Sequence, residues 1–120
     1  MTLLVRDEAD IVGTNIAYHL ARGVSHIIAT DNGSTDETGE ILRTYERLGV
    51  LTYILEEAHT HDQGLWVTRM AHEAYRQFPS SFVFHVDADE FWWPASGNLV
   101  ETLISAFHGF DGVGTVRRVN

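Results

Sequence analysis

The sequence has 120 residues, of which 44% are hydrophobic, and its formal net charge is -9. This length fits a single domain over residues 1–120, without a run of about 18 apolar residues that could span a bilayer. All eight basic residues are arginines and cysteine is absent, so a phosphate-loop lysine, disulfides and thiolate metal sites are excluded. The acidic charge also disfavours nucleic acid as a partner, whereas a divalent cation can hold a nucleotide diphosphate on an acidic protein.

The first part of the chain alternates between strand and helix patterns. Apolar runs at 3–5 and 27–30 predict two strands. Between them, apolar residues recur every four positions, which predicts a helix over 10–22 that ends at Gly23. The residues that carry this period are Val12, Ile16 and Leu20.

The next part repeats the alternation. Residues 31–36, Asp-Asn-Gly-Ser-Thr-Asp, are typical of a turn, and Ser34 with Glu37 forms a predicted capping box for a second helix. A third strand is predicted at 51–55. The inner face of the second helix is predicted to carry Ile41, Leu42, Tyr45 and Leu48.

The last part contributes two more helices and two more strands. Residues 82–86 are apolar enough to predict a central fourth strand, and 112–119 predict a fifth. Asn98 with Glu101 is a capping signal for a helix between them. A third helix is predicted before the fourth strand, with an inner face of Val67, Met70, Ala71, Ala74 and Phe78.

This order of elements predicts the α/β class, with an open, Rossmann-like, mainly parallel sheet and helices on both faces. Because the chain ends on a strand-like run, we expect a truncated domain whose C-terminal part is absent. No signal peptide pattern is present, so we expect a cytoplasmic protein, or one at the cytoplasmic face of a membrane.

Carboxylates follow each of the first four predicted strands. In an open α/β sheet the ligand binds outside the carboxyl ends of the strands, so these side chains should meet in one acidic crevice. Such crowding is repulsive unless a cation neutralises it. The residues at the four strand ends are Asp7 and Glu8, Asp31, Glu56 and Glu57, and Asp87, Asp89 and Glu90.

Asp87 and Asp89 form the sharpest pair. Two carboxylates one residue apart at the end of a buried strand can converge on one hard cation. A solvated acidic turn is the alternative, but three aromatic residues follow at 91–93, and such a turn has little use for them. Trp92 and Trp93 either contact a sugar or complete the core, and both interpretations stay open.

Three segments carry a family resemblance: residues 7–11 (Asp-Glu-Ala-Asp-Ile), 31–36, and 87–91 (Asp-Ala-Asp-Glu-Phe). In order and spacing they resemble family 2 glycosyltransferases and their close relatives, across nearly the whole chain. The resemblance implies a GT-A fold, a nucleotide-diphosphate sugar donor, most often a UDP-sugar, and Mn²⁺ or Mg²⁺. The acceptor, whether saccharide, lipid or protein, is not implied.

The resemblance also implies residue roles. Asp31 would lie by the nucleoside, Asp87 near the ribose and the metal, and Asp89 would ligate the metal directly. Glu8 matches the acidic residue of the family's usual Asn-Glu pair near the base, but Asp7 stands where asparagine is usual.

Arg69 resembles the family's basic residue on the helix before the Asp-x-Asp strand. The resemblance implies that it faces the base or the diphosphate. The alternative, which the sequence favours equally, is an exposed arginine on the helix surface. No catalytic base is assigned, because the usual candidate lies in the segment after this part of the fold.

Two other functions remain as alternatives. A domain that binds a nucleotide sugar or a partner without turnover would need the same site but no base. A metal-dependent nucleotidyltransferase would need a glycine-rich basic loop after the first strand, where this chain has Arg6 followed by acidic residues.

Overall fold

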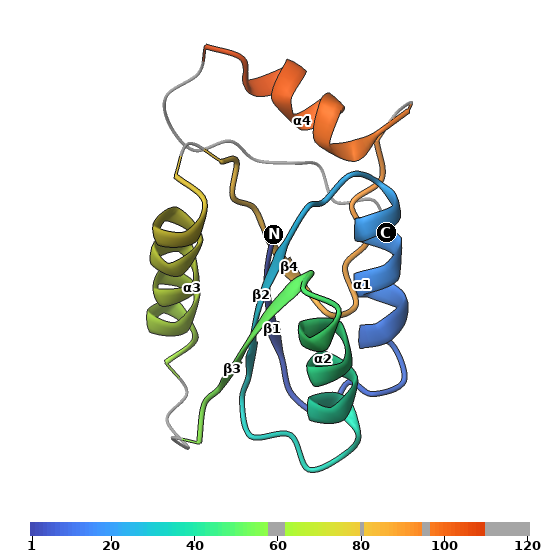
Figure 1. Ribbon diagram of the computed structural model, residues 1–120, viewed down its shortest axis with the longest axis vertical. Helices are drawn as coiled ribbons and strands as arrows, with labels where there is room; N and C mark the ends of the chain where they lie inside the picture. Colours follow the sequence, from blue (N-terminus) through green and yellow to red (C-terminus); the bar gives the residue numbers. More distant parts are fainter. Residues whose placement is uncertain (58–61, 80, 95–96, 110–120) are drawn as a thin grey trace.

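Four parallel strands form the sheet at the centre of the fold (Figure 1). They are β1 (Thr2–Val5), β2 (Ile27–Asp31), β3 (Leu51–Leu55) and β4 (His85–Asp87), in the spatial order β3-β2-β1-β4. The computed structural model describes residues 1–57, 62–79, 81–94 and 97–109, so the predicted fifth strand lies outside the described residues.

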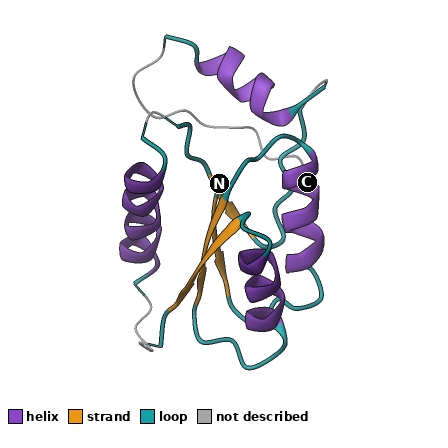
Figure 2. Cartoon of the chain, in the orientation of Figure 1, coloured by secondary structure: helices purple, strands orange, loops and turns teal. Residues whose placement is uncertain are grey.

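Helices cover both faces of this sheet. α1 (Val12–Ala21) and α2 (Thr38–Arg47) lie on one face and α3 (Gln63–Gln77) on the other, as Figure 2 shows. α4 (Leu99–Phe107) crosses the end of the sheet where the strands begin, so the strands end at the opposite edge (Figure 1). The predicted α/β class, with a parallel, Rossmann-like sheet, is confirmed.

The alternation of side chains along the strands divides the core between the two faces. Leu3 and Val5 of β1 belong to the larger cluster with α1 and α2, whereas Leu4 packs against the smaller cluster under α3. This is the two-residue period of a strand covered on both sides. The larger cluster also contains Val12, Ile16, Val24, Ile27, Ala29, Leu42, Leu51, Val86 and Ala88.

The predicted capping box before α2 is wrong. The helix begins at Thr38, and its N-cap residue Glu37 makes no side-chain capping bond. The Ser34 hydroxyl instead accepts a hydrogen bond from the Asp7 backbone N–H at 2.9 Å. A tertiary partner therefore replaces the local one that the sequence pattern predicted.

The fourth strand is shorter and more peripheral than predicted. β4 begins at His85, where its pairing with β1 begins, and among the described strands it pairs only with β1. Phe82 and Val83 lie outside it and are exposed. In α3 the predicted face is shifted: Trp66, Met70 and Ala74 are buried. The residues Ala71 and Phe78 of the predicted face are exposed.

The capping signal before α4 is confirmed. The Asn98 side chain accepts hydrogen bonds from the backbone N–H groups of Val100 and Glu101. Of the helices in the described part of the chain, none is long and apolar enough to cross a membrane.

Candidate functional site

A cleft of about 390 Å³ lies at the carboxyl ends of β1 and β4, beside the first turn of α3. This is the edge at which the sequence predicted an acidic crevice. The cleft is lined by Leu4, Val5, Arg6, Glu8, Asn32, Gln63, Trp66, Asp87, Ala88 and Asp89. Three acidic residues and one arginine therefore line one open space.

The Asp87–Asp89 turn presents its two carboxylates on one side. Ala88 between them is buried in the core, while Asp87 and Asp89 are exposed and both line the cleft. The turn closes because the Glu90 N–H donates to the Asp87 carbonyl at 2.9 Å. One Asp87 carboxylate oxygen lies 3.5 Å from His85 Nε2, and the other ring nitrogen of His85 shares a hydrogen bond with Thr2.

A buried asparagine holds this turn from behind. The Asn15 side chain, on α1, is fully buried, and its amide nitrogen donates to the carbonyls of Ala88 at 3.0 Å and Glu90 at 2.7 Å. The Asp87 carbonyl lies at 3.4 Å from the same nitrogen. Asn15 was not predicted as a site residue, although a polar residue next to Ile16 on the apolar face of the predicted helix was a signal for it.

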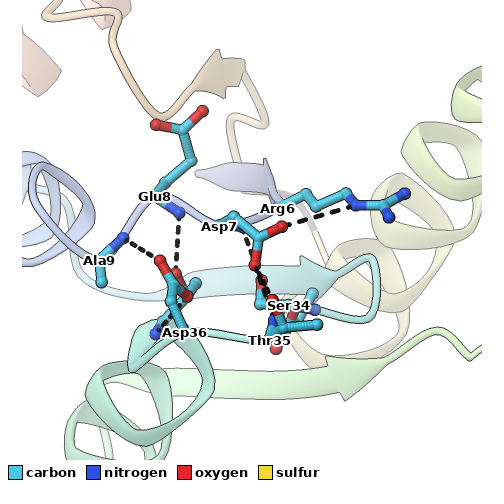
Figure 3. A network of polar contacts seen from close by, with 9 residues as sticks. Arg6, Asp7, Glu8, Ala9, Ser34, Thr35 and Asp36 are labelled. Atoms are coloured by element: carbon cyan, nitrogen blue, oxygen red, sulfur yellow. Dashed lines mark hydrogen bonds and ion pairs between the residues drawn. The ribbon is translucent and has the colours of Figure 1, made fainter.

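The loop after β1 is tied to the loop after β2 (Figure 3). Asp7 has a left-handed backbone with φ of 52°, and its carboxylate accepts hydrogen bonds from the Thr35 N–H at 2.7 Å and the Thr35 hydroxyl at 3.2 Å. The Asp36 carboxylate accepts from the Ala9 N–H at 3.1 Å and the Thr38 N–H at 2.9 Å. A hydrogen bond with the Thr38 side chain lowers the pKa of Asp36 most, and the backbone bonds from Thr38 and Ala9 lower it further. Asp7 and Asp36 thus connect the two loops.

Glu8 differs from its neighbours because its carboxylate points away from this network, as Figure 3 shows, and lines the cleft. Its backbone N–H is held by the Thr38 hydroxyl at 2.9 Å. Desolvation and the negative charges of Asp10 and Asp89, with smaller contributions from Asp36 and Asp7, raise its pKa. The cleft is therefore a place where an added carboxylate charge is unfavourable and an added cation is favourable.

Asp31 is buried beside the cleft rather than lining it. One of its carboxylate oxygens accepts from the Ser34 N–H at 2.8 Å and the other from the Tyr53 hydroxyl at 3.0 Å. Its side chain borders a second hollow of about 420 Å³ between the loop at 34–37 and Tyr53, whereas its neighbour Asn32 lines the cleft.

Arg69 forms an ion pair with Glu56, with 3.1 Å between Nη1 and Oε2, and is not among the residues that line the cleft. Arg6 is the basic side chain that the described residues bring to the cleft. Its Nε lies 3.8 Å from the Asp7 carboxylate, too far for a hydrogen bond. The structure thus gathers Arg6, Glu8, Asp87 and Asp89 and keeps Asp7, Asp31 and Arg69 outside.

The aromatic residues after the turn have different places. Trp92 packs against the core, with its ring 4.9 Å from that of Phe84, whereas Trp93 is 76% exposed. The Arg22 guanidinium lies over the rings of both Trp93 and Tyr18, 5.2 Å and 4.0 Å from their ring centres. Trp92 therefore completes the core, and Trp93 lies against the outer side of α1.

Comparison with known proteins identifies the family. Curated proteins and solved structures give no match. The model of Glycosyltransferase family 92 matches residues 3–114, a range that includes all the residues of the cleft. The prediction of a glycosyltransferase family is thereby confirmed, and the family that matches is family 92, whereas the resemblance named family 2 and its close relatives. The chain belongs to glycosyltransferase family 92 and is a transferase that acts on glycosyl groups.

Proposed function

We propose that this glycosyltransferase uses a nucleotide-diphosphate sugar, with a UDP-sugar as the first candidate, and binds its diphosphate in the cleft through Mn²⁺ or Mg²⁺ on Asp87 and Asp89. The observation that carries the proposal is the Asp87–Asp89 turn. Asp87 and Asp89 are exposed and line the cleft that Arg6 also lines, while Ala88 between them is buried. The acceptor is a saccharide, lipid or protein that offers a hydroxyl group.

The metal ligands available in the cleft suit a cation that also binds the substrate. Among the described residues, no group of three or more acidic, histidine or cysteine side chains is arranged to hold a metal. Two carboxylates are nevertheless sufficient for Mg²⁺ or Mn²⁺ where substrate phosphates and water complete the coordination. This type of site is expected to bind its metal tightly only when the nucleotide is present.

The charges of the cleft fit a diphosphate. A bound cation would neutralise the charge that develops on the leaving diphosphate. Arg6 would add a planar guanidinium, which matches pairs of phosphate oxygens. Glu8 faces the same space with a raised pKa, so a cation on the neighbouring Asp89 would relieve part of its electrostatic cost.

Three other residues take supporting roles in this proposal. The carboxylates of Asp7 and Asp31 already accept hydrogen bonds from N–H and O–H groups, so their contribution is to fix the loops beside the nucleoside. Arg69 remains a candidate for contact with the base or diphosphate, and its neutralisation of Glu56 supports the β3 end of the site.

Calorimetric titration of UDP, with and without Mn²⁺, tests the proposal. The variants are Asp89→Asn and Asp87→Asn, which remove charge at constant shape, with Glu101→Gln as the matched control in α4 at the other end of the sheet. We expect Mn²⁺-dependent UDP binding that each aspartate variant weakens at least roughly 10-fold and the control preserves. Equal binding in all four proteins, or binding in none, would refute the site.

Hydrolysis of the UDP-sugar donor separates the enzyme from a domain that binds without turnover. Slow, Mn²⁺-dependent release of UDP that is lost in Asp89→Asn supports transfer chemistry at this cleft. Tight Mn²⁺-dependent binding with no release under any acceptor condition would favour the binding domain instead.

A further inference from the structure

Two polar side chains lie on the buried face of α1. Asn15 and His19 are one helical turn apart, and each has no solvent-exposed surface. Burial of an amide and an imidazole is costly unless their hydrogen-bonding groups are satisfied. Their partners therefore indicate why polar residues occupy core positions here.

The partners of Asn15 are the carbonyls of the Asp87–Asp89 turn. Its amide nitrogen has two hydrogens, which match the two short contacts to Ala88 and Glu90. These two carbonyls lie on either side of Asp89. One side chain thus fixes the backbone immediately before and after the proposed metal ligand.

His19 fixes the orientation of Asn15. Its Nδ1 lies 2.9 Å from the Asn15 backbone oxygen and 3.1 Å from the Asn15 side-chain oxygen, both acceptors, so Nδ1 carries the proton. Its Nε2 lies 3.4 Å from the Trp92 backbone N–H, a donor, so Nε2 carries none. Burial lowers the pKa of His19, which favours this neutral form. With its oxygen held by His19, the Asn15 amide must direct its nitrogen at the turn.

The chain of contacts is continuous from the Trp92 backbone to His19, from His19 to Asn15, and from Asn15 to the carbonyls around Asp89. We infer that Asn15 and His19 are positioning residues that set the Asp87 and Asp89 carboxylates for the divalent cation and the donor diphosphate. This inference rests on the proposed function, because it assigns the two residues to the same site. They touch neither the cation nor the substrate.

The test compares Mn²⁺ affinity in the presence of UDP among folded variants of the full chain. Asn15→Asp keeps the shape but replaces the donor by an acceptor that the carbonyls repel, and His19→Leu removes both ring nitrogens. His19→Asn is the conservative variant, since its amide nitrogen can replace Nδ1 as the donor to Asn15. Leu103→Ala, at a buried position of α4, is the control for a general loss of stability.

We expect Asn15→Asp and His19→Leu to weaken Mn²⁺ binding roughly 10- to 100-fold, the usual effect of losing a partner that orients a metal ligand. His19→Asn should recover most of the Mn²⁺ affinity. Leu103→Ala should bind Mn²⁺ as the wild type does, even if its melting temperature falls as much as that of the Asn15 and His19 variants. The inference is overturned if the folded Asn15 and His19 variants bind Mn²⁺ as the wild type does, or if Leu103→Ala weakens binding equally.

A measurement on the wild-type protein covers the case in which the variants do not fold. The ¹⁵N chemical shifts of the His19 ring should show the neutral form with the proton on Nδ1, and a proton on Nε2 would overturn the inference. Absence of Mn²⁺–UDP binding in the wild type would instead refute the proposed function, so the two failures are distinguishable.

Discussion

Replacement of Asp7 by alanine should destabilise the protein by about 2 kcal/mol, although Asp7 lies in an exposed loop. Alanine in the left-handed conformation costs roughly 1 kcal/mol, whereas aspartate and asparagine tolerate it. The variant also loses two hydrogen bonds from Thr35, which contribute about 0.5 kcal/mol each at this half-exposed position. Asparagine keeps both the backbone preference and the accepting oxygen, so Asp7→Asn should stay within about 0.5 kcal/mol of the wild type.

Urea unfolding followed by tryptophan fluorescence measures these differences. A loss of about 2 kcal/mol lowers the midpoint by about 1 M at the usual dependence for a domain of this size. Asp10→Ala, an exposed acidic residue of the same loop, serves as the control and should change little. The reasoning is refuted if Asp7→Ala unfolds at the wild-type midpoint, or if Asp7→Asn is as unstable as Asp7→Ala.

Two further variants test the electrostatics of the site. Because the pKa of Glu8 is raised in the folded protein, ionisation of this side chain favours the unfolded chain. The stability associated with Glu8 is therefore fully present below the ordinary glutamate pKa, and it is lost as the pH rises through the folded-state value. Glu8→Gln should therefore unfold at a higher urea concentration than the wild type at about pH 7 and at the same concentration at about pH 3; a destabilised variant at pH 7 would contradict this sign. Tyr53→Phe removes the hydroxyl that donates to the buried Asp31 and should cost about 1–2 kcal/mol, measured by the same unfolding assay. The exposed Tyr75→Phe is its control, and equal stability of the two variants would rule out the stabilising bond.

The strands and the location of the site were predictable because both depend on simple periodicities. The apolar runs at 3–5, 27–30 and 51–55 coincide with β1, β2 and β3 to within one residue. Parallel strands bring their carboxyl ends to one edge, so the position of Asp87 and Asp89 in a cleft followed from their place after a strand.

The hydrogen-bond partners were less predictable because they join residues far apart in the sequence. Ser34 with Glu37 matched a local capping pattern, but the Asp7 N–H, 27 residues away, occupies the hydroxyl. Similarly, Asn15 is a polar residue on an apolar helix face. Its presence there is explained by its hydrogen bonds to carbonyls 73 and 75 residues further along the chain. No pattern within one element contains this information.

The acidic residues at the strand ends divide into two groups by the donors that reach them. The carboxylates of Asp7, Asp31 and Asp36 accept hydrogen bonds from backbone N–H groups, which stabilise a negative charge without a metal. Within the described residues, the carboxylates of Asp87 and Asp89 accept none from the backbone, and the backbone carbonyls behind them are held instead. The same crowding of carboxylates thus holds the loops together at one side of the site. At the other side it leaves negative charge near which the described residues place Arg6 and His85, and which a bound cation would balance.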